Sequence, residues 1–283
     1  MKYTIIADSG CDLKTAYVQS SKLNFTTVPL FITIDGKDYI DDETLETREL
    51  LSVMKGSKGA PKTACPSPYV FAEEMRKGNE NIICVTLSSK LSGSYNSARL
   101  AAETVGKEDP GKKIFVLDSL SASAGMAVII QKLIELIECD LYSFGEIIKK
   151  IEKIRSGTRT RFLLHDLANL IKTGRMSKIK GIIASVLKIK LICGEKGAGE
   201  IEQFGKAIGT KKSLQLLSEC PKDKVEAEGN GLTVAISHCH NEEDAGFLKS
   251  LLESRFGLKQ IKILLMRGLA SFYANDKGLV LAY

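Results

Sequence analysis

No apolar stretch in this 283-residue sequence approaches the roughly 20 residues that a membrane-spanning helix needs. The first twenty residues also lack the basic start, apolar centre and small-residue cleavage site of a secretory leader. These two absences predict a cytoplasmic protein without a membrane span. The seven cysteines are scattered and never spaced Cys-x-x-Cys, which favours reduced thiols over a disulfide framework or a zinc site.

The motifs of several enzyme classes are missing as well. No Gly-x-Ser-x-Gly sequence surrounds Ser92, and none of the three histidines, His165, His238 and His240, lies in a recognisable catalytic motif. The glycine-rich stretch "GEKGAGE" at 194–200 lacks the Gly-Lys-Ser/Thr ending of a phosphate-binding loop. Because it lies between two short apolar runs, we predict a hairpin turn there and no nucleotide site.

Two clusters of polar residues resemble catalytic or metal sites. His238 and His240 flank Cys239, but alternation along a strand points Cys239 away from both histidines, and two ligands do not make a zinc site. Asp8 and Asp12 with Asp118 can be interpreted as catalytic carboxylates, although capping of loops is the commoner role. We therefore expect no metal and no cofactor.

The net charge of +6 favours anionic partners in principle. The basic residues are nevertheless spread along helices that also carry Glu and Asp. The densest basic segment, residues 172–190, is interleaved with Ile, Val and Leu, as in a helix with one solvated face. We predict no nucleic-acid binding.

Apolar runs that end in polar loops alternate with segments of helical spacing along the first half of the chain. This alternation predicts an α/β fold with a mostly parallel N-terminal sheet flanked by helices on both faces. The expected strands are residues 4–7, 23–34, 82–87 and 114–117, and the expected helices cover 130–137 and 144–151.

The pattern changes after "RSGTRTR" at 155–161, and the length suits roughly two domains. We place an N-terminal α/β domain at 1–157 and a C-terminal α/β domain at 158–283. The second domain is expected to contain a helix-rich segment at 166–188, the hairpin, helices near 210–219 and 242–256, and strands at 232–237, 261–266 and 279–283.

The segment "SSKLSGSYNSA" at 88–98 places small hydroxyl side chains between a strand and a helix. Ligands of open parallel sheets bind beyond the carboxyl ends of the strands, where helices begin with unpaired N–H groups. The Ser92 hydroxyl and the amides near Gly93 and Ser94 can hold a carboxylate or a phosphate there. The competing interpretation, that these serines only cap a helix, stays open.

Several ordered motifs resemble the DegV family, fatty-acid-binding proteins that serve bacterial fatty acid kinases, and the resemblance covers nearly the whole chain. The motifs are "ADSGCDL" at 7–13, "VPLFITIDGKDYID" at 28–41, "TACPSP" at 63–68, "SSKLSGSYNSA" at 88–98, "LDSLSASAG" at 117–125, "LANLIKTGRMSKIKGIIASVLKIKLI" at 167–192 and "GLVLAY" at 278–283.

The resemblance implies a two-domain protein that holds a long-chain fatty acid between its domains and performs no chemistry itself. By motif position, Thr63 and Ser92 contact the carboxylate, with Gly93 and Ser94 beside them. Arg175 matches a family arginine that serves the site or partner docking, although it also suits an ordinary helix end. The implied partners are the fatty acid, the ATP-binding subunit of the kinase and, transiently, a membrane surface.

The sequence departs from the family pattern at three positions. Tyr273 stands where a histidine is usual, and a phenol donates one hydrogen bond without carrying positive charge. Ala64 replaces a common second hydroxyl, and Cys65 follows it.

The alternative function is an enzyme that binds a phosphorylated metabolite at the serine loop with Asp8 or Asp118 as base. A phosphate ligand calls for basic side chains near Ser92, and the loop offers only Lys90 and Arg99. The apolar stretch at 181–192 is either a pocket wall or plain interdomain core.

Overall fold

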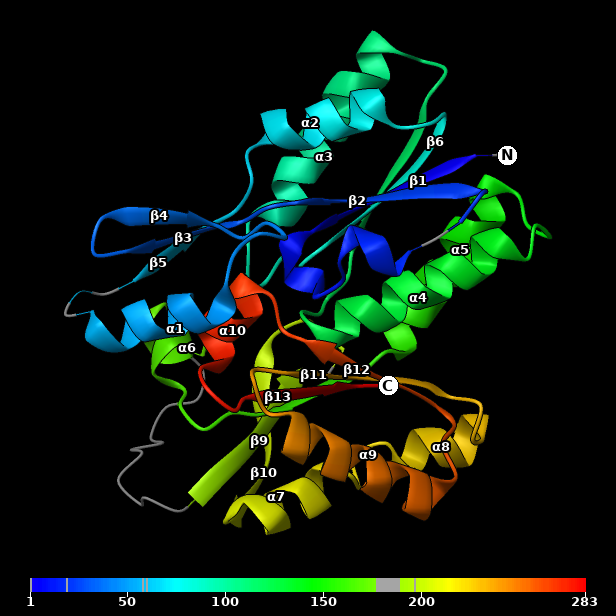
Figure 1. Cartoon of the computed structure of the whole chain (residues 1–283). Helices are drawn as coiled ribbons and strands as arrows, with labels where there is room; N and C mark the ends of the chain where they lie inside the picture. The colour runs from blue at the N-terminus through cyan, green and yellow to red at the C-terminus, as the bar shows by residue number, and fades with distance from the viewer. Residues whose placement is uncertain (1, 19, 58, 60, 177–188, 196) are drawn as a thin grey trace.

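The structure is a computed structural model that describes residues 2–18, 20–57, 59, 61–176, 189–195 and 197–283 (Figure 1). The strands of these residues form three sheets. No helix in the described ranges is long and apolar enough to cross a membrane. Each of the seven cysteines is unpaired, as their spacing predicts.

A four-stranded parallel sheet lies in the N-terminal half, with the strand order β2-β1-β6-β7. Its strands are β1 (Tyr3–Asp8), β2 (Leu23–Val28), β6 (Asn81–Thr86) and β7 (Lys113–Asp118). The flanking helices are α2 (Pro68–Lys77), α3 (Ser94–Glu108), α4 (Ala124–Glu138) and α5 (Phe144–Gly157). This arrangement confirms the predicted α/β class.

Side chains of the parallel sheet alternate between two apolar layers, because successive residues of a strand point to opposite faces. Ile6 and Ile82 pack with α2 and α3. Ile5 and Ile83 belong to a second layer that includes α4 and α5. The sheet is therefore buried on both sides, which explains why its strands are continuous apolar runs.

The single strand predicted at 23–34 is wrong, because the chain changes sheets at Pro29. Proline has no N–H to donate to a strand ladder, so β2 ends at Val28. The next strand, β3 (Phe31–Ile34), lies at the centre of an antiparallel three-stranded sheet, β4-β3-β5. Its partners are β4 (Lys37–Ile40) and β5 (Lys62–Ala64).

The small sheet carries N-terminal residues toward the C-terminal half of the molecule. Helix α1 (Thr47–Gly56) comes between β4 and β5 in the chain and lies beside α10 (Gly268–Ala274), as Figure 1 shows. Ile32 and Leu50 form one buried cluster with Phe272 of α10. Segments more than 200 residues apart in the sequence thus close one side of the molecule.

The second large sheet has six strands in the order β10-β9-β8-β13-β11-β12, and every neighbouring pair except β11 and β12 is antiparallel. Its strands are β8 (Thr160–Leu163), β9 (Ile189–Glu195), β10 (Ile201–Ile208), β11 (Thr233–His238), β12 (Gln260–Leu265) and β13 (Leu279–Ala282). The accompanying helices are α7 (Thr210–Leu217), α8 (Lys222–Glu228) and α9 (Glu242–Phe256).

The hairpin predicted around 194–200 is confirmed by the antiparallel pairing of β9 with β10. Within the helix-rich segment predicted at 166–188, α6 (Ala168–Lys172) is a short helix, and residues 177–188 lie outside the described residues. The candidate wall at 181–192 is therefore described only from Ile189 onward. Helix α5 ends at Gly157 and β8 begins at Thr160, and the domain boundary placed near residue 157 stays a prediction.

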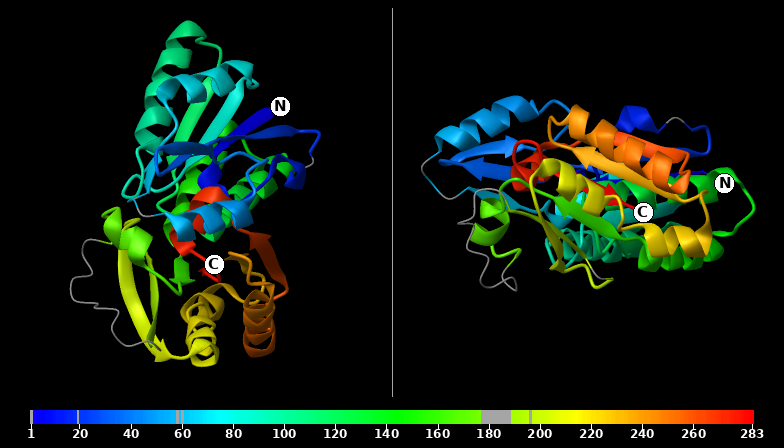
Figure 2. Two further views of the ribbon diagram at one scale, coloured as in Figure 1. Left: turned by 60° about the vertical axis from the view of Figure 1, so that its left-hand side comes forward. Right: turned by 90° about the horizontal axis from the view of Figure 1, so that it is seen from below.

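The two large sheets lie in different halves of the molecule, as Figure 1 and the left view of Figure 2 show, and one buried apolar core draws residues from both. Leu163 and Ile192 pack away from that core in a cluster that includes α7 and α9. Phe162 and Val280, on the opposite face of the same sheet, join the cluster that contains Ile5 of β1. The inner faces of both halves thus meet.

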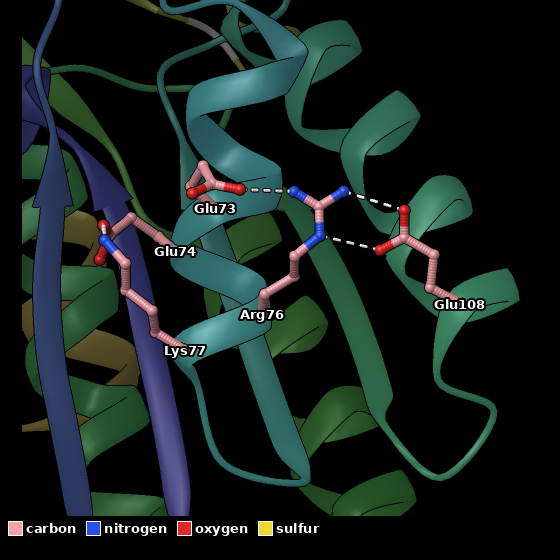
Figure 3. Close-up of polar contacts among 5 residues, drawn as sticks. All are labelled: Glu73, Glu74, Arg76, Lys77 and Glu108. Atoms are coloured by element: carbon pink, nitrogen blue, oxygen red, sulfur yellow. Dashed lines mark hydrogen bonds and ion pairs between the residues drawn. The ribbon is translucent and has the colours of Figure 1, made fainter.

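An ion-pair network fixes α2 against α3 on the outer surface (Figure 3). The Arg76 guanidinium donates to both oxygens of Glu108, at 2.8 and 2.9 Å, and to Glu73 at 2.6 Å. Lys77 pairs with Glu74 at 2.8 Å. Since these side chains are largely exposed, the network orients the helices more than it stabilises the fold.

Candidate ligand-binding site

A cavity of about 370 Å³ lies between the halves of the protein, within the ~300–1,000 Å³ typical of small-molecule sites. Its wall is mostly apolar and draws on both halves of the chain. Representative apolar lining residues are Leu87, Leu120, Phe162, Leu164, Leu269 and Val280. Such a wall suits a ligand that is mostly apolar. The few polar groups in the wall can bind one polar end of that ligand.

Thr63 and Tyr273, both singled out from the sequence, meet at the cavity wall. The Thr63 Oγ1 atom lies 2.8 Å from the Tyr273 hydroxyl oxygen, and either atom can be the donor. Thr63 is positioned by the pairing of β5 with β3, where it lies opposite Ile32. Tyr273 comes from α10, so one hydroxyl pair joins the two halves.

Ser92 and Gly93 also line the cavity, at the start of α3. The Ser92 hydroxyl accepts a hydrogen bond from the Ser94 amide at 3.2 Å, so its helix-capping role is real. Ser92 also lines the cavity, and its predicted role in binding an anion stays a prediction. Ser94 does not line the cavity; it is fully buried behind Ser92, with the two hydroxyl oxygens 3.0 Å apart.

The close approach of two motif loops explains the glycine next to Ser92. A Cβ atom added at Gly93 would lie 3.0 Å from the Cys65 sulfur, which is tighter than ordinary packing. Cys65, which directly follows β5 and its Thr63, is therefore in contact with the loop that carries Ser92. Thr63, Ser92 and Tyr273 form what we call the hydroxyl cluster.

Arg175 lines the same cavity and is held by backbone carbonyl groups. Its Nε donates to the Leu91 carbonyl at 3.3 Å and its Nη1 to the Thr173 carbonyl at 2.8 Å. Gly174 before it adopts a positive φ of 78°, as is usual after the end of a helix. The helix-end interpretation and the position beside the serine loop are both correct for this arginine.

A second polar group of the cavity wall was missed in the sequence. The hydroxyl oxygens of Ser121 and Thr160 lie 2.6 Å apart, and both residues line the cavity. The available signal was the serine-rich loop after β7, since loops that follow neighbouring parallel strands meet at one edge of the sheet. Leu120 and Ser123 in that loop have positive φ angles of 51° and 55°, strain that often marks functional loops.

The β9–β10 hairpin closes over the serine loop from the C-terminal half. The Ser88 hydroxyl donates to the Gly199 carbonyl at 2.9 Å. Gly199 has a φ of 75°, and an added Cβ would lie 2.4 Å from the Ser88 Oγ. Only glycine therefore fits this turn without displacing the loop.

The aspartates considered as catalytic groups act as loop caps. Asp8 accepts from the amides of Leu87, at 2.8 Å, and Gly10, at 3.1 Å, and its complete burial raises its pKa to about 7. Asp118 accepts from the amides of Ser89 and Leu120, both at 3.1 Å. Neither carboxyl group lines the cavity.

The Asp12 carboxylate binds groups from two distant segments of the chain. It accepts from the Ser123 hydroxyl and, at 3.0 Å, from the Arg267 amide, and burial raises its pKa to about 6. Lys90 and Arg99, the two basic residues considered as phosphate partners, lie outside the cavity wall, since Lys90 is exposed and Arg99 pairs with Glu103 at 3.0 Å.

The histidines considered as metal ligands have local partners. His238 accepts from the Asn241 amide at 3.1 Å, and the His240 ring lies 2.8 Å from the Thr47 hydroxyl. Across the described part of the chain, no group of three His, Cys, Asp or Glu side chains is arranged to hold a metal ion.

The family model of DegV, described as uncharacterised proteins, matches residues 2–281. The chain belongs to the DegV family. A DegV domain-containing protein of Streptococcus pyogenes serotype M18 is 36% identical over 284 residues, covering 100% of this chain and 99% of the relative. The resemblance found in the sequence motifs is confirmed.

Solved structures of DegV proteins share this fold over essentially the whole chain. A DegV protein of Ruminococcus gnavus with vaccenic acid is 35% identical with a TM-score of 0.93, covering 100% of this chain and 99% of that chain. The fatty acid kinase B3 protein of Streptococcus pneumoniae, loaded with linoleic acid, is 35% identical with a TM-score of 0.92 and the same coverage. A DegV protein of Eubacterium eligens loaded with heptadecanoic acid is 32% identical, with a TM-score of 0.90 over 99% of this chain and 98% of that chain.

Proposed function

We propose that this DegV protein binds a long-chain fatty acid in the cavity, with the carboxyl group at the hydroxyl cluster. The observation that carries the proposal is an apolar cavity between the halves whose wall includes Thr63, Ser92 and Tyr273. The fatty acids in the related structures of Ruminococcus gnavus and Streptococcus pneumoniae support it.

The physical chemistry of the cavity suits such a ligand. Transfer of about fifteen methylenes from water releases about 12 kcal/mol at ~0.8 kcal/mol per CH₂, before the entropy of binding is subtracted. A buried carboxyl group without partners would cost several kcal/mol. Hydrogen bonds from neutral hydroxyl and amide groups at the cluster remove that cost, so the acyl chain supplies the affinity and the cluster fixes the orientation.

We further propose that the protein presents the carboxyl group to a separate ATP-dependent kinase in the cytoplasm, which forms the acyl phosphate. The similarity to the fatty acid kinase B3 protein supports this partner. In this account the protein itself performs no chemistry, and Arg175 serves the headgroup or the docking of the kinase. Transient contact with a membrane stays a prediction.

Ser92→Ala is expected to weaken fatty acid binding about 5- to 150-fold, the equivalent of about 1–3 kcal/mol for a lost hydrogen bond to a buried or charged group. Titration calorimetry with decanoate on lipid-free protein measures it. Ser89→Ala is the matched control, because Ser89 is an exposed residue of the same loop outside the cavity wall. Equal affinity of Ser92→Ala and the control would remove Ser92 from the headgroup.

Acyl phosphate is expected only when loaded protein, ATP and the ATP-binding kinase subunit are mixed, and mass spectrometry detects it as the hydroxamate. Omission of any one of the three should abolish the product. ATP consumption by this protein alone, or binding of phosphorylated metabolites to an empty cavity, would contradict the proposal and favour an enzyme.

A further inference from the structure

A second pair of hydroxyl groups lies in the cavity wall, apart from the hydroxyl cluster. The Ser121 and Thr160 hydroxyl oxygens are 2.6 Å apart, and the two residues are only 4% and 6% exposed. Ser121 comes from the loop after β7 and Thr160 from the start of β8, so each half of the protein contributes one residue. Both line the cavity. The mostly apolar wall therefore contains a buried polar position that the proposed headgroup site does not include.

This pair has hydrogen-bonding capacity left over. Two hydroxyl groups carry two protons and four lone pairs. Their mutual bond uses one proton and one lone pair, and the described residues supply no further hydrogen bond to either oxygen. A Cβ atom added at Gly125 would overlap both hydroxyl oxygens, so α4 closes the side of the pair that faces it. The second proton and the remaining lone pairs are therefore available to a group in the cavity.

Glu195 places acceptor atoms next to the same pair. Its Oε1 accepts from the Thr160 amide at 3.2 Å, and its Oε2 accepts from the Gly197 amide. Glu195 is buried and lines the cavity. A ligand group at this position thus meets a hydroxyl donor together with carboxyl acceptors. A neutral hydroxyl group, which both donates and accepts, matches these surroundings, whereas a carboxylate would bring only further acceptors.

The pair lies far enough from the hydroxyl cluster to contact the middle of an acyl chain. Leu164, directly after β8, lies near the residue that follows Tyr273, since an added Cβ at Gly278 would lie 2.6 Å from the Ala274 Cβ and 3.0 Å from the Leu164 Cδ2. Thr160 comes four residues earlier and lines the same cavity, and ~3.3 Å per strand residue places it about 13 Å away. An extended acyl chain covers that distance with roughly ten zigzag bonds of ~1.5 Å each.

We propose that Ser121, Thr160 and Glu195 form a subsite for a hydroxyl group in the middle of the acyl chain, so that the protein selects mid-chain hydroxylated long-chain fatty acids. This inference rests on the proposed function and specifies its ligand class. A plain acyl chain covers the pair with methylenes and leaves a buried hydroxyl proton without an acceptor, which is costly. A hydroxylated chain avoids that cost, because its oxygen accepts from the pair and its proton binds a Glu195 oxygen or a free lone pair.

Competition between matched acids tests the inference. Lipid-free wild-type protein receives an equimolar mixture of stearate, 2-hydroxystearate, 10-hydroxystearate and 12-hydroxystearate, and mass spectrometry quantifies the acids that stay bound through gel filtration. We expect at least one of the two mid-chain acids to exceed stearate about threefold or more, as for one net hydrogen bond between neutral groups. Wild-type protein that retains stearate in amounts equal to or above both mid-chain acids would overturn the inference.

The double change Ser121→Ala with Thr160→Val removes both hydroxyl groups and nearly preserves the side-chain volumes. The ratio of mid-chain acids to stearate should fall about fivefold or more, whereas the ratio of 2-hydroxystearate to stearate should not change. Thr86→Val is the matched control, a buried threonine at the end of β6 outside the cavity wall, and should keep the wild-type ratios. A double variant that keeps the mid-chain preference would contradict the subsite. Wild-type protein that retains none of the four acids would instead contradict the proposed function.

Discussion

Ala270→Trp should abolish high-affinity fatty acid binding and leave the protein folded. Ala270 is part of α10, one helical turn before Tyr273, and lines the cavity. An indole group there occupies space that the acyl chain needs. Exclusion of about four methylenes removes about 3 kcal/mol of transfer free energy, which corresponds to an affinity loss of at least about a hundredfold.

The matched control is Ala227→Trp, the same change on an exposed position of α8. Calorimetry should find wild-type affinity for this control. Because the indole of Ala270→Trp fills a cavity, the Tm of that variant should equal or exceed that of lipid-free wild-type protein. A folded Ala270→Trp protein with wild-type affinity would show that the acyl chain binds elsewhere.

Arg267→Met should lower the free energy of unfolding by about 3–5 kcal/mol, the usual cost of removing one partner of a buried charge network. Arg267 is only 4% exposed. Its guanidinium donates to the Leu13 carbonyl and the Thr27 hydroxyl, both at 3.1 Å, and to the Asp41 carbonyl at 2.9 Å. Its backbone amide donates to Asp12. One side chain from the C-terminal half thus holds three segments of the N-terminal half.

Loss of the cation would leave the buried Asp41 carboxylate without the positive charge beside it, whereas the backbone amide that binds Asp12 stays in place. Burial raises the pKa of Asp41, and the Arg267 charge partly opposes that rise. Addition of Asp41→Asn to Arg267→Met should therefore recover part of the lost stability. The carboxylate of Asp41 also accepts from the amides of Gly268 and Leu269, so the recovery is incomplete.

Urea unfolding of lipid-free protein is the appropriate measurement, since bound ligand adds to the apparent stability. Arg255→Met is the control; Arg255 pairs with Glu219 at the surface, and its removal should change stability by about 0.5 kcal/mol or less. An equally small effect of Arg267→Met would contradict the role of this arginine as the link between the halves.

The sequence predicts the parts of the fold that depend on local patterns. The parallel strands β1, β6 and β7 are continuous apolar runs followed by polar loops, and that pattern also locates the serine loop around Ser92. The hairpin between β9 and β10 follows from its glycine-rich turn. Each of these features is determined within about ten residues of chain.

Features that depend on distant contacts could not be predicted in this way. The antiparallel order of the six-stranded sheet has no local signature. The prediction of one strand at 23–34 gives too little weight to Pro29, where the chain changes sheets. The contact of Thr63 with Tyr273 joins residues 210 positions apart, and only the family motifs single out these two residues. The complete burial of Asp8 and Ser94 likewise depends on packing by several elements.

Solvent extraction of the purified protein followed by mass spectrometry tests the central claim most directly, namely that an acyl chain occupies the cavity between the two halves. We expect close to one long-chain fatty acid per wild-type chain and almost none from Ala270→Trp prepared in parallel, as for a single small-molecule site of this volume. Wild-type protein that carries no fatty acid and takes up none when it is offered would contradict the account.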